Sequence, residues 1–416
     1  MTQPLIHGGD WAGFEAQYGR PPLDFSANVS PLGLPEAVRR AVEASLPHAD
    51  RYPDPLCRAL TSALAQAEGL PEAWLLCGAG AAGLIYRLVL ALRPARALVC
   101  APTFAEYGEA LTLAGCELLR CPLTAERGFA VTEAILEAIT PGVELVFLCE
   151  PNNPTGRTTP RPLLDRILAR CQRIGARLVI DECFNEFLDD PAAHTMKGRL
   201  GGCENLLILN AFTKIYAMAG LRLGWCACSD EALLARMAKA GPPWAVSGPA
   251  QAAGLAALAL PDYPAQVRAL VQAQRPRLAQ GLARLGLTVY PGEANYLLLH
   301  SPHPGLAAAM RGQGVLIRDC ANYPGLGPGY YRVAVRTGEE NDRLLAAFAA
   351  VLGAASRSSS ARGFKFCKRS VFLWPDALWC RAPCPARAKA CWRRGFAAFS
   401  SRTACAVPPS KARTWP

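Results

Sequence analysis

The sequence predicts an α/β protein with a large domain built on a mostly parallel β-sheet and a smaller α+β domain. At 416 residues the chain exceeds the size of one ordinary hydrophobic core, so two domains are expected. Hydrophobic residues make up 51% of the chain and charged residues 19%, which is typical of a compact folded protein. Short apolar runs alternate with helix-length segments, as in a parallel sheet that helices cover on both faces.

The N-terminal segment, MTQPLIHGGD, has neither the basic start nor the apolar stretch of a secretory leader. No later apolar run is long and uncharged enough to span a bilayer. The 17 cysteines are scattered through apolar segments, where they are expected to be small buried side chains with free thiols. These features predict a cytoplasmic protein.

Four apolar runs have the length of β-strands, at residues 95–102, 144–151, 176–183 and 205–212. Helix-length segments such as LLDRILARCQRIG separate them. Parallel sheets bind ligands beyond the carboxyl ends of their strands, so the residues that end these runs are expected to form a site.

Polar residues follow three of these runs in order. Asn153 lies in the turn PNNPTG, Asp181 ends the next run, Lys214 follows the last one, and Arg222 comes eight residues later. Each residue alone has an ordinary structural interpretation, as a turn, a helix cap or a solvated side chain. Their spacings of 28, 33 and 8 residues on successive strand ends favour one shared site.

This set suits pyridoxal 5'-phosphate (PLP). A buried carboxylate, Asp181, would keep the ring nitrogen protonated, which the ring needs in order to withdraw electrons. The Asn153 amide would donate to the ring hydroxyl. A desolvated lysine near other cations has a lowered pKa, so Lys214 is predicted to be the catalytic residue, holding the cofactor as a Schiff base and later carrying a proton.

The cofactor phosphate needs backbone N–H groups and a cation. The glycine-rich turn in LLCGAGAAG is predicted to supply the N–H groups, at Gly80 and Ala81, and Arg222 the cation. Phe104, in PTFAEYG, is placed to stack on the ring, and Thr213 directly before the lysine completes the predicted cofactor contacts. Taken alone, a glycine turn is a weak signal and an aromatic residue is more often core.

Together these motifs resemble those of the fold type I PLP-dependent transferases, the aspartate aminotransferase-like enzymes. RYPDP (51–55) is similar to the histidinol-phosphate aminotransferase branch. HGGD (7–10), DFSANVSPLG (24–33) and CANYPGL (320–326) resemble more narrowly the L-threonine-O-3-phosphate decarboxylases of cobalamin biosynthesis. The resemblance covers residues 7–353, and it implies a PLP enzyme of this fold.

The resemblance implies that Tyr52 reaches the cofactor phosphate of the neighbouring subunit, and therefore a homodimer with shared active sites. Two departures from the family pattern, Ala211 in place of a hydroxyl residue and Ala81–Ala82 in place of polar residues, predict weaker cofactor binding. No metal site is expected. The resemblance also implies six substrate-binding residues, namely His7, Gly8, Asn28, Asn153, Arg318 and Arg332.

The implied reaction is PLP-dependent decarboxylation of O-phospho-L-threonine, giving (R)-1-aminopropan-2-ol O-2-phosphate and CO2. The Cα bond that stands perpendicular to the cofactor ring is the one that breaks. Arg318 and Arg332 can each bind phosphate or carboxylate, so residue identity leaves an aminotransferase for histidinol phosphate or an aromatic amino acid open. A third alternative is a PLP-fold binding protein or regulator that contacts nucleic acid, although Lys214, Asp181 and Asn153 favour chemistry. The expected partners are a small phosphorylated amino acid and a second copy of the chain, without nucleic acid or membrane.

Four segments are expected along the chain. Residues 1–48 form an N-terminal segment that joins the small domain, 49–250 the large PLP-binding domain, 251–354 the small C-terminal domain, and 355–416 a basic tail that contains Cys and Trp. The composition shift SRSSSARG after the helical pattern DRLLAAFAAVLG marks where this tail begins.

The tail accounts for the basic net charge of +11. From Ser356 onward there are 13 Lys and Arg residues and one acid, which leaves 31 basic residues (44 minus 13) and 32 acidic residues (33 minus 1) in the body. A disordered or aberrant extension is the favoured interpretation. A zinc site formed by Cys380, Cys384 and Cys391 is disfavoured, because these cysteines lack paired spacing and a histidine.

Overall fold

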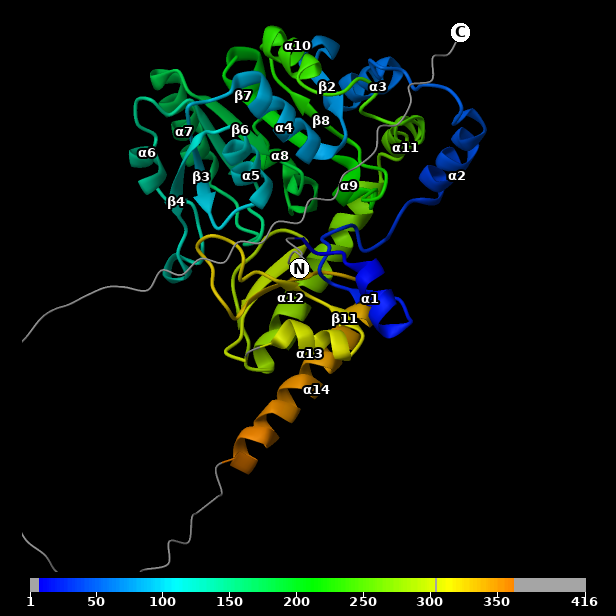
Figure 1. Cartoon of the computed structure of the whole chain (residues 1–416), viewed down its shortest axis with the longest axis vertical. Helices are drawn as coiled ribbons and strands as arrows, with labels where there is room; N and C mark the ends of the chain where they lie inside the picture. Colours follow the sequence, from blue (N-terminus) through cyan, green and yellow to red (C-terminus); the bar gives the residue numbers. More distant parts are fainter. Residues whose placement is uncertain (1–6, 304, 363–416) are drawn as a thin grey trace, which may run out of the picture. The chain divides into compact units, whose positions relative to one another are not determined.

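The computed structural model of the chain describes residues 7–303 and 305–362 (Figure 1). The tail from residue 363 onward, including the three cysteines of the disfavoured zinc site, lies outside the described residues. Helix α14 (Gly338–Arg362) includes residues 355–362, the first eight residues of the predicted tail. No Gly or Pro occurs between Gly353 and Gly363 to interrupt a helix, so the serine-rich composition shift does not end it.

A seven-stranded sheet dominates the structure. The four predicted runs form neighbouring strands β7, β6, β5 and β3, which are all parallel, so the predicted mostly parallel sheet is confirmed. Strand β8 is antiparallel to both of its neighbours. The strands in sheet order are β2 (Leu75–Gly78), β8 (Gly224–Ala227), β7 (Leu206–Ala211), β6 (Arg177–Asp181), β5 (Leu145–Cys149), β3 (Arg96–Ala101) and β4 (Glu117–Pro122).

Helices cover both faces of this sheet, because alternate residues of each strand point to opposite sides. In β5, Leu145 and Phe147 pack in the core beneath α4, α5 and α10, whereas Val146 and Leu148 pack in the core on the other face, which includes α6 and α7. These helices are labelled in the upper part of Figure 1. Their bounds are α4 (Gly80–Leu92), α5 (Ala105–Leu113), α6 (Ala134–Ala138), α7 (Arg161–Ile174) and α10 (Glu231–Lys239).

Three helices, α2 (Glu36–Ser45), α3 (Arg58–Glu68) and α11 (Gly248–Leu258), pack together beside strand β2. Two short helices follow strand ends or turns, α8 (Pro191–His194) and α9 (Phe212–Ile215). Helix α9 directly continues strand β7 and carries Lys214.

A second, antiparallel sheet has the strand order β12-β13-β10-β9. It packs with α12, α13 and α14 around a separate core. Near the N-terminus, β1 pairs in parallel with β11, so the first segment of the chain lies beside residues from its last third. The elements of this region are α1 (Trp11–Tyr18), β1 (Leu23–Asp24), α12 (Tyr263–Arg284), β9 (Thr288–Val289), β10 (Tyr296–His300), α13 (Leu306–Gly312), β11 (Val315–Leu316), β12 (Arg318–Asp319) and β13 (Tyr330–Ala334). The domain boundaries at residues 48, 250 and 354 stay predictions.

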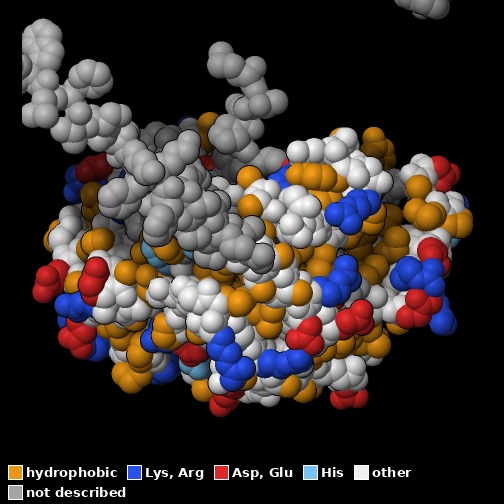
Figure 2. Space-filling view, turned by 90° about the horizontal axis from the view of Figure 1, so that it is seen from below, with side chains coloured by type: hydrophobic (Ala, Val, Ile, Leu, Met, Phe, Trp, Pro, Cys, Tyr) orange, Lys and Arg blue, Asp and Glu red, His pale blue; other side chains and the backbone are white. Residues whose placement is uncertain are grey.

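Basic and acidic side chains are interspersed on the face of the molecule that Figure 2 shows, in keeping with the near-neutral charge of the body. The twelve cysteines of the described residues are all free, and all except Cys77 are buried. In the part of the chain that the structure describes, no helix has the length and apolar character needed to cross a membrane.

Candidate active site

One small cavity lies where the carboxyl ends of β5, β6 and β7 meet. Seven residues predicted from the sequence line it, namely Ala81, Phe104, Asn153, Asp181, Thr213, Lys214 and Arg222. Its walls also include five residues that were not predicted to contact a ligand, Ala82, Cys149, Cys183, Phe184 and Ala211. The structure therefore brings the strand-end residues together as the spacing predicts.

The Asp181 carboxylate is buried and held by two donors. The Tyr107 hydroxyl donates to Oδ2 at 2.7 Å, and the backbone N–H of Cys183 donates to Oδ1 at 3.0 Å. Burial raises the pKa of Tyr107 well above its usual range, so the phenol keeps its proton and stays a donor. Tyr107 is itself fixed by stacking on Phe147 at 4.8 Å. Asp181 is thus a rigid acceptor facing the cavity.

Lys214 also lines the cavity and is half-buried, with its ammonium 5.5 Å from the centre of the Phe184 ring. Burial, followed by the positive charges of Arg332 and Arg222, lowers the pKa of Lys214 from 10.5 to about 8. A substantial fraction of this side chain is therefore the neutral, nucleophilic amine at mildly alkaline pH.

The start of α4 and Arg222 form a cradle with no room for an extra side-chain carbon. Gly80 has a φ of +75°, and a Cβ at this position would lie 3.0 Å from Arg222 Nη2. A Cβ on Gly224 would lie 2.7 Å from the backbone nitrogen of Ala81. The first N–H groups of this 13-residue helix and the guanidinium group thus meet at one place, which suits a phosphate group.

Arg332 connects this cavity to the second sheet. Its Nη1 donates to Asn153 Oδ1, its Nη2 donates to the Ser26 carbonyl oxygen at 2.8 Å, and its guanidinium lies 5.5 Å from the Tyr296 ring. Because Asn153 Oδ1 accepts from Arg332, the amide nitrogen is the part of Asn153 left to donate into the cavity. Within residues 7–303 and 305–362, Arg332 Nε is buried without a hydrogen-bond partner.

Arg318 lies directly opposite Arg332 on the neighbouring strand. Its Nη2 donates to Asn322 Oδ1 at 2.9 Å, and its guanidinium lies 5.4 Å from the Tyr323 ring. Both arginines are only 6% exposed. Two buried guanidinium groups on adjacent strands concentrate positive charge and N–H donors in one region, which suits an anionic ligand.

The HGGD segment packs against the same region. A Cβ on Gly8 would lie 2.3 Å from the Ser26 carbonyl oxygen, and the backbone N–H of Gly9 donates to Ser26 Oγ at 2.7 Å. His7 Nε2 lies 2.8 Å from Glu106 Oε1, and its ring is 6.4 Å from that of Phe104. The structure therefore places His7 and Gly8 beside Phe104 and the acceptor of Arg332.

Asn28, the remaining predicted substrate residue, is 1% exposed. Among the residues that the structure describes, neither the nitrogen nor the oxygen of its side-chain amide has a hydrogen-bond partner. Buried polar atoms without partners are costly, which fits the predicted role of this amide in contacting a ligand.

Unlike the other predicted cofactor-binding residues, Tyr52 lies neither at the cavity nor at the adjoining start of α4. Its side chain is 80% exposed and stacks on Trp244 with the ring centres 4.3 Å apart. The family resemblance implies that Tyr52 reaches the cofactor of the neighbouring subunit, and its exposure leaves it accessible for such a contact.

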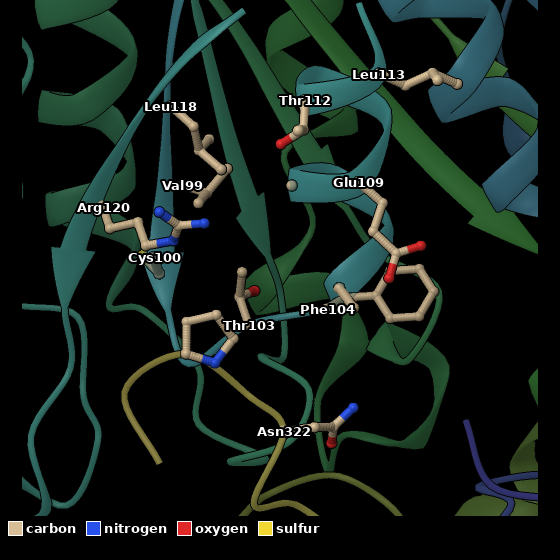
Figure 3. A pocket seen from close by; sticks show the side chains of 13 residues that line it. Val99, Cys100, Thr103, Phe104, Glu109, Thr112, Leu113, Leu118, Arg120 and Asn322 are labelled. Carbon is tan, nitrogen blue, oxygen red and sulfur yellow. The ribbon is translucent and has the colours of Figure 1, made fainter. Parts of the chain in front are cut away.

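A more open hollow of about 610 Å³ adjoins the cavity, and Phe104 lines both (Figure 3). Its walls come from β3, α5 and the loop after β12, where Asn322 accepts from Arg318. The hollow therefore reaches from the predicted cofactor-stacking residue to the side chain that holds Arg318.

Sequence reasoning missed several residues that shape the site. Tyr107 lies one helical turn after Phe104 in PTFAEYG, and this i,i+3 spacing was a usable signal. Ser26 lies within DFSANVSPLG and Asn322 within CANYPGL, two motifs whose other members were assigned. Phe184 carried no signal, because an aromatic residue after a strand is most often core.

Comparisons with known proteins agree with this arrangement. Residues 20–348 match the family Aminotransferase class I and II. The chain is 42% identical to threonine-phosphate decarboxylase of Salmonella typhimurium, over 83% of this chain and 96% of that one. It is 36% identical to histidinol-phosphate aminotransferase of Symbiobacterium thermophilum, over 80% and 91%. The solved structure of L-threonine-O-3-phosphate decarboxylase from Porphyromonas gingivalis superposes with a TM-score of 0.71 at 25% identity, covering 79% of this chain and 99% of that one.

Proposed function

The chain belongs to the aminotransferase class I and II family, and from this premise we propose that it is a PLP-dependent decarboxylase of O-phospho-L-threonine in cobalamin biosynthesis. The observation that carries the proposal is the 42% identity with a threonine-phosphate decarboxylase along nearly the whole body of the chain. The paired Arg318 and Arg332 beside the Lys214 cavity support it, since this substrate carries both a phosphate and a carboxylate.

The residues present fit the cofactor. Gly80 and Arg222 form a cradle that a Cβ would fill, Asp181 is a buried acceptor for the ring nitrogen, and Lys214 is a half-buried amine with a lowered pKa. In this proposal Asn153 donates to the ring hydroxyl and Phe104 covers the ring. When bound, PLP supplies an electron-withdrawing ring that stabilises the negative charge left on Cα after a bond to it breaks.

The protein groups have separate tasks in this proposal. Lys214 holds the cofactor covalently between turnovers and delivers a proton to the substrate carbon once CO2 has left, for which a pKa of about 8 is well suited. Arg318 and Arg332 bind the two anionic groups of the substrate, with Asn28, His7 and Gly8 around it. By fixing these anions, they select which Cα bond is aligned with the ring, and so which reaction occurs.

A homodimer with shared sites is part of the proposal. Ten large apolar side chains in the described residues are strongly exposed, and seven of them cluster in two stretches of the sequence around α2, α3 and α11. Exposed apolar patches of this kind mark protein interfaces. The seven are Leu32, Leu34, Leu46, Tyr52, Leu56, Trp244 and Leu255. A second copy on this surface would cover the patch and would receive Tyr52.

A cytoplasmic location completes the proposal. The twelve cysteines of the described residues are free thiols, even though several lie near one another in the cores. Free thiols in this number suit a reducing compartment.

The aminotransferase alternative is supported by the 36% identity with a histidinol-phosphate aminotransferase. The two reactions can be distinguished by whether turnover needs a second substrate. A decarboxylase regains its starting state after each turnover, whereas an aminotransferase needs a 2-oxo acid to do so. We expect purified protein to release CO2 from O-phospho-L-threonine without any 2-oxo acid, forming 1-aminopropan-2-ol phosphate. Radiometric CO2 capture with amine analysis measures both. Turnover only after addition of 2-oxoglutarate would instead establish the aminotransferase.

The lowered pKa of Lys214 predicts how cofactor uptake depends on pH. The neutral amine is the reactive form, so the rate at which apo-protein becomes coloured with PLP should rise as the pH passes through about 8. Stopped-flow absorbance between about pH 6 and 10 measures this rate. In the Arg332→Leu variant the midpoint should move upward, because one of the positive charges that lower the pKa is lost. A rate that still rises without a plateau at about pH 10, as the ordinary lysine pKa of 10.5 would give, would contradict the assignment.

A further inference from the structure

Tyr52 and Trp244 form an aromatic pair on the surface of the chain, with their planes 24° apart. Both side chains are strongly exposed, Tyr52 at 80% and Trp244 at 42%. A pair this exposed buries little apolar surface, so it contributes little to the stability of a single chain. Its stacking geometry does, however, restrict where the Tyr52 side chain can point.

The backbone of Trp244 is held in an unfavourable conformation. Its φ is +53°, in the left-handed region that a bulky side chain rarely adopts. This conformation brings the Cβ of a non-glycine residue too close to the following carbonyl oxygen, which makes it unfavourable. Such strain persists only where the surroundings impose it, and it concentrates at functional positions.

Two sets of hydrogen bonds hold the chain around Trp244 in this conformation. Arg87 in α4 is 9% exposed, and it donates to the carbonyl oxygens of Ala238 at 3.0 Å and Pro242 at 2.6 Å. A Cβ on Gly241 would lie 2.5 Å from Arg87 Nε, so this loop packs tightly on the arginine. The loop before Trp244 is thus fixed to the helix whose first residues form the phosphate cradle of this chain.

The second set of hydrogen bonds joins the two aromatic segments to each other. Gln251 Nε2 donates to the carbonyl oxygen of Asp54 at 2.9 Å and to that of Val246 at 3.0 Å. Asp54 lies two residues after Tyr52, and Val246 lies two residues after Trp244. The stack is therefore held from both sides, although neither ring is buried.

From this geometry we infer that Trp244 is a positioning residue, which holds Tyr52 in the orientation from which it reaches the cofactor phosphate of the partner subunit. The inference rests on the proposed homodimer with shared sites. Trp244 touches neither substrate nor cofactor in this scheme; it restricts a side chain that would otherwise rotate freely in solvent. Its contribution to cofactor affinity is then the ordering of Tyr52 before the contact forms.

The test measures PLP affinity of apo-protein by equilibrium dialysis, with the association state followed by sedimentation, in five variants. Trp244→Ala is expected to weaken PLP binding about threefold to tenfold, the range that corresponds to an aromatic pair. Trp244→Phe keeps a ring for stacking and should restore most of the affinity. Tyr52→Phe should weaken binding in the same direction, and adding Trp244→Ala to it should have little further effect, since the contact is already lost. Leu90→Ala, at another exposed apolar residue, should leave affinity unchanged.

The outcomes separate this inference from the proposed function. If Tyr52→Phe binds PLP as tightly as the parent protein, the shared-site proposal itself is wrong. If Tyr52→Phe weakens binding but Trp244→Ala does not, only the role of Trp244 is overturned. Additive losses in the double variant, or a loss confined to dissociated monomer, would also overturn it, because Trp244 would then act independently of Tyr52.

Discussion

Replacing Lys214 with alanine is expected to abolish covalent retention of PLP and to lower the rate of CO2 release by ~10²–10⁴-fold, the usual contribution of a positioned acid–base group. The structure provides the physical reason. Lys214 is a half-buried amine with a pKa of about 8 in the cavity that Asp181, Asn153 and Arg222 line, so its loss removes the nucleophile and the proton carrier together. Absorbance after gel filtration and CO2 capture measure the two losses.

Borohydride reduction supplies the site-specific control for this prediction. It should fix PLP onto Lys214 in the parent protein, and peptide mass spectrometry identifies the labelled residue. Lys239→Ala, at an exposed lysine of α10, should keep both colour and activity. Label on any lysine other than Lys214 would show that the strand-end constellation has been misassigned.

The Arg332→Leu variant is expected to lose ~2–5 kcal/mol of transition-state binding, which is roughly 30-fold to several thousandfold in kcat/KM. Arg332 is 6% exposed, and its Nε is buried without a partner among the described residues, so a substrate anion would meet a desolvated guanidinium. Leucine leaves that anion without its charge partner. The cofactor colour should survive, because the cradle of Gly80 and Arg222 is intact. Steady-state kinetics with O-phospho-L-threonine measure the loss.

A matched arginine variant distinguishes this effect from a general loss of charge. Arg277 is half exposed and pairs with Asp342 away from the cavity, so Arg277→Leu should leave kcat/KM near the parent value. An Arg332→Leu variant with unchanged kcat/KM would remove Arg332 from the substrate site. Loss of PLP together with activity would indicate that Arg332 supports the cofactor pocket through Asn153 instead.

Much of the large sheet was predictable because its central strands are buried on both faces and read as continuous apolar runs. The four predicted runs contain β3, β5, β6 and β7 in full, and the α/β fold class and family resemblance are confirmed. Strand β8 could not be predicted in the same way. It is a four-residue segment, GWCA, and its antiparallel direction depends on pairing with the nearby β7 and with β2, which is distant in sequence.

The site residues also differ in whether the sequence could predict them. Residues that end successive parallel strands, Asp181 and Lys214 among them, are brought together by sheet topology, which spacing alone can indicate. Contacts between the two sheets cannot be inferred from spacing. Arg332 meets the Asn153 oxygen from 179 residues away, and the Ser26 carbonyl from 306 residues away, so both depend on how the second sheet packs. The stack of Tyr52 on Trp244 belongs to the same group.

The pairing of β1 with β11 affects the order in which parts of the protein can fold during synthesis on the ribosome. Leu23 pairs with Val315, so the first strand stays without its partner until about three quarters of the chain has emerged. The cavity residues from Ala81 to Arg222 are all translated earlier and belong to a sheet that does not need β1. Domains fold largely as units during synthesis. A nascent chain therefore contains all the cavity residues well before Arg318 and Arg332 are synthesised, and before β1 can pair with β11 and fix the N-terminal residues that we assign to the substrate.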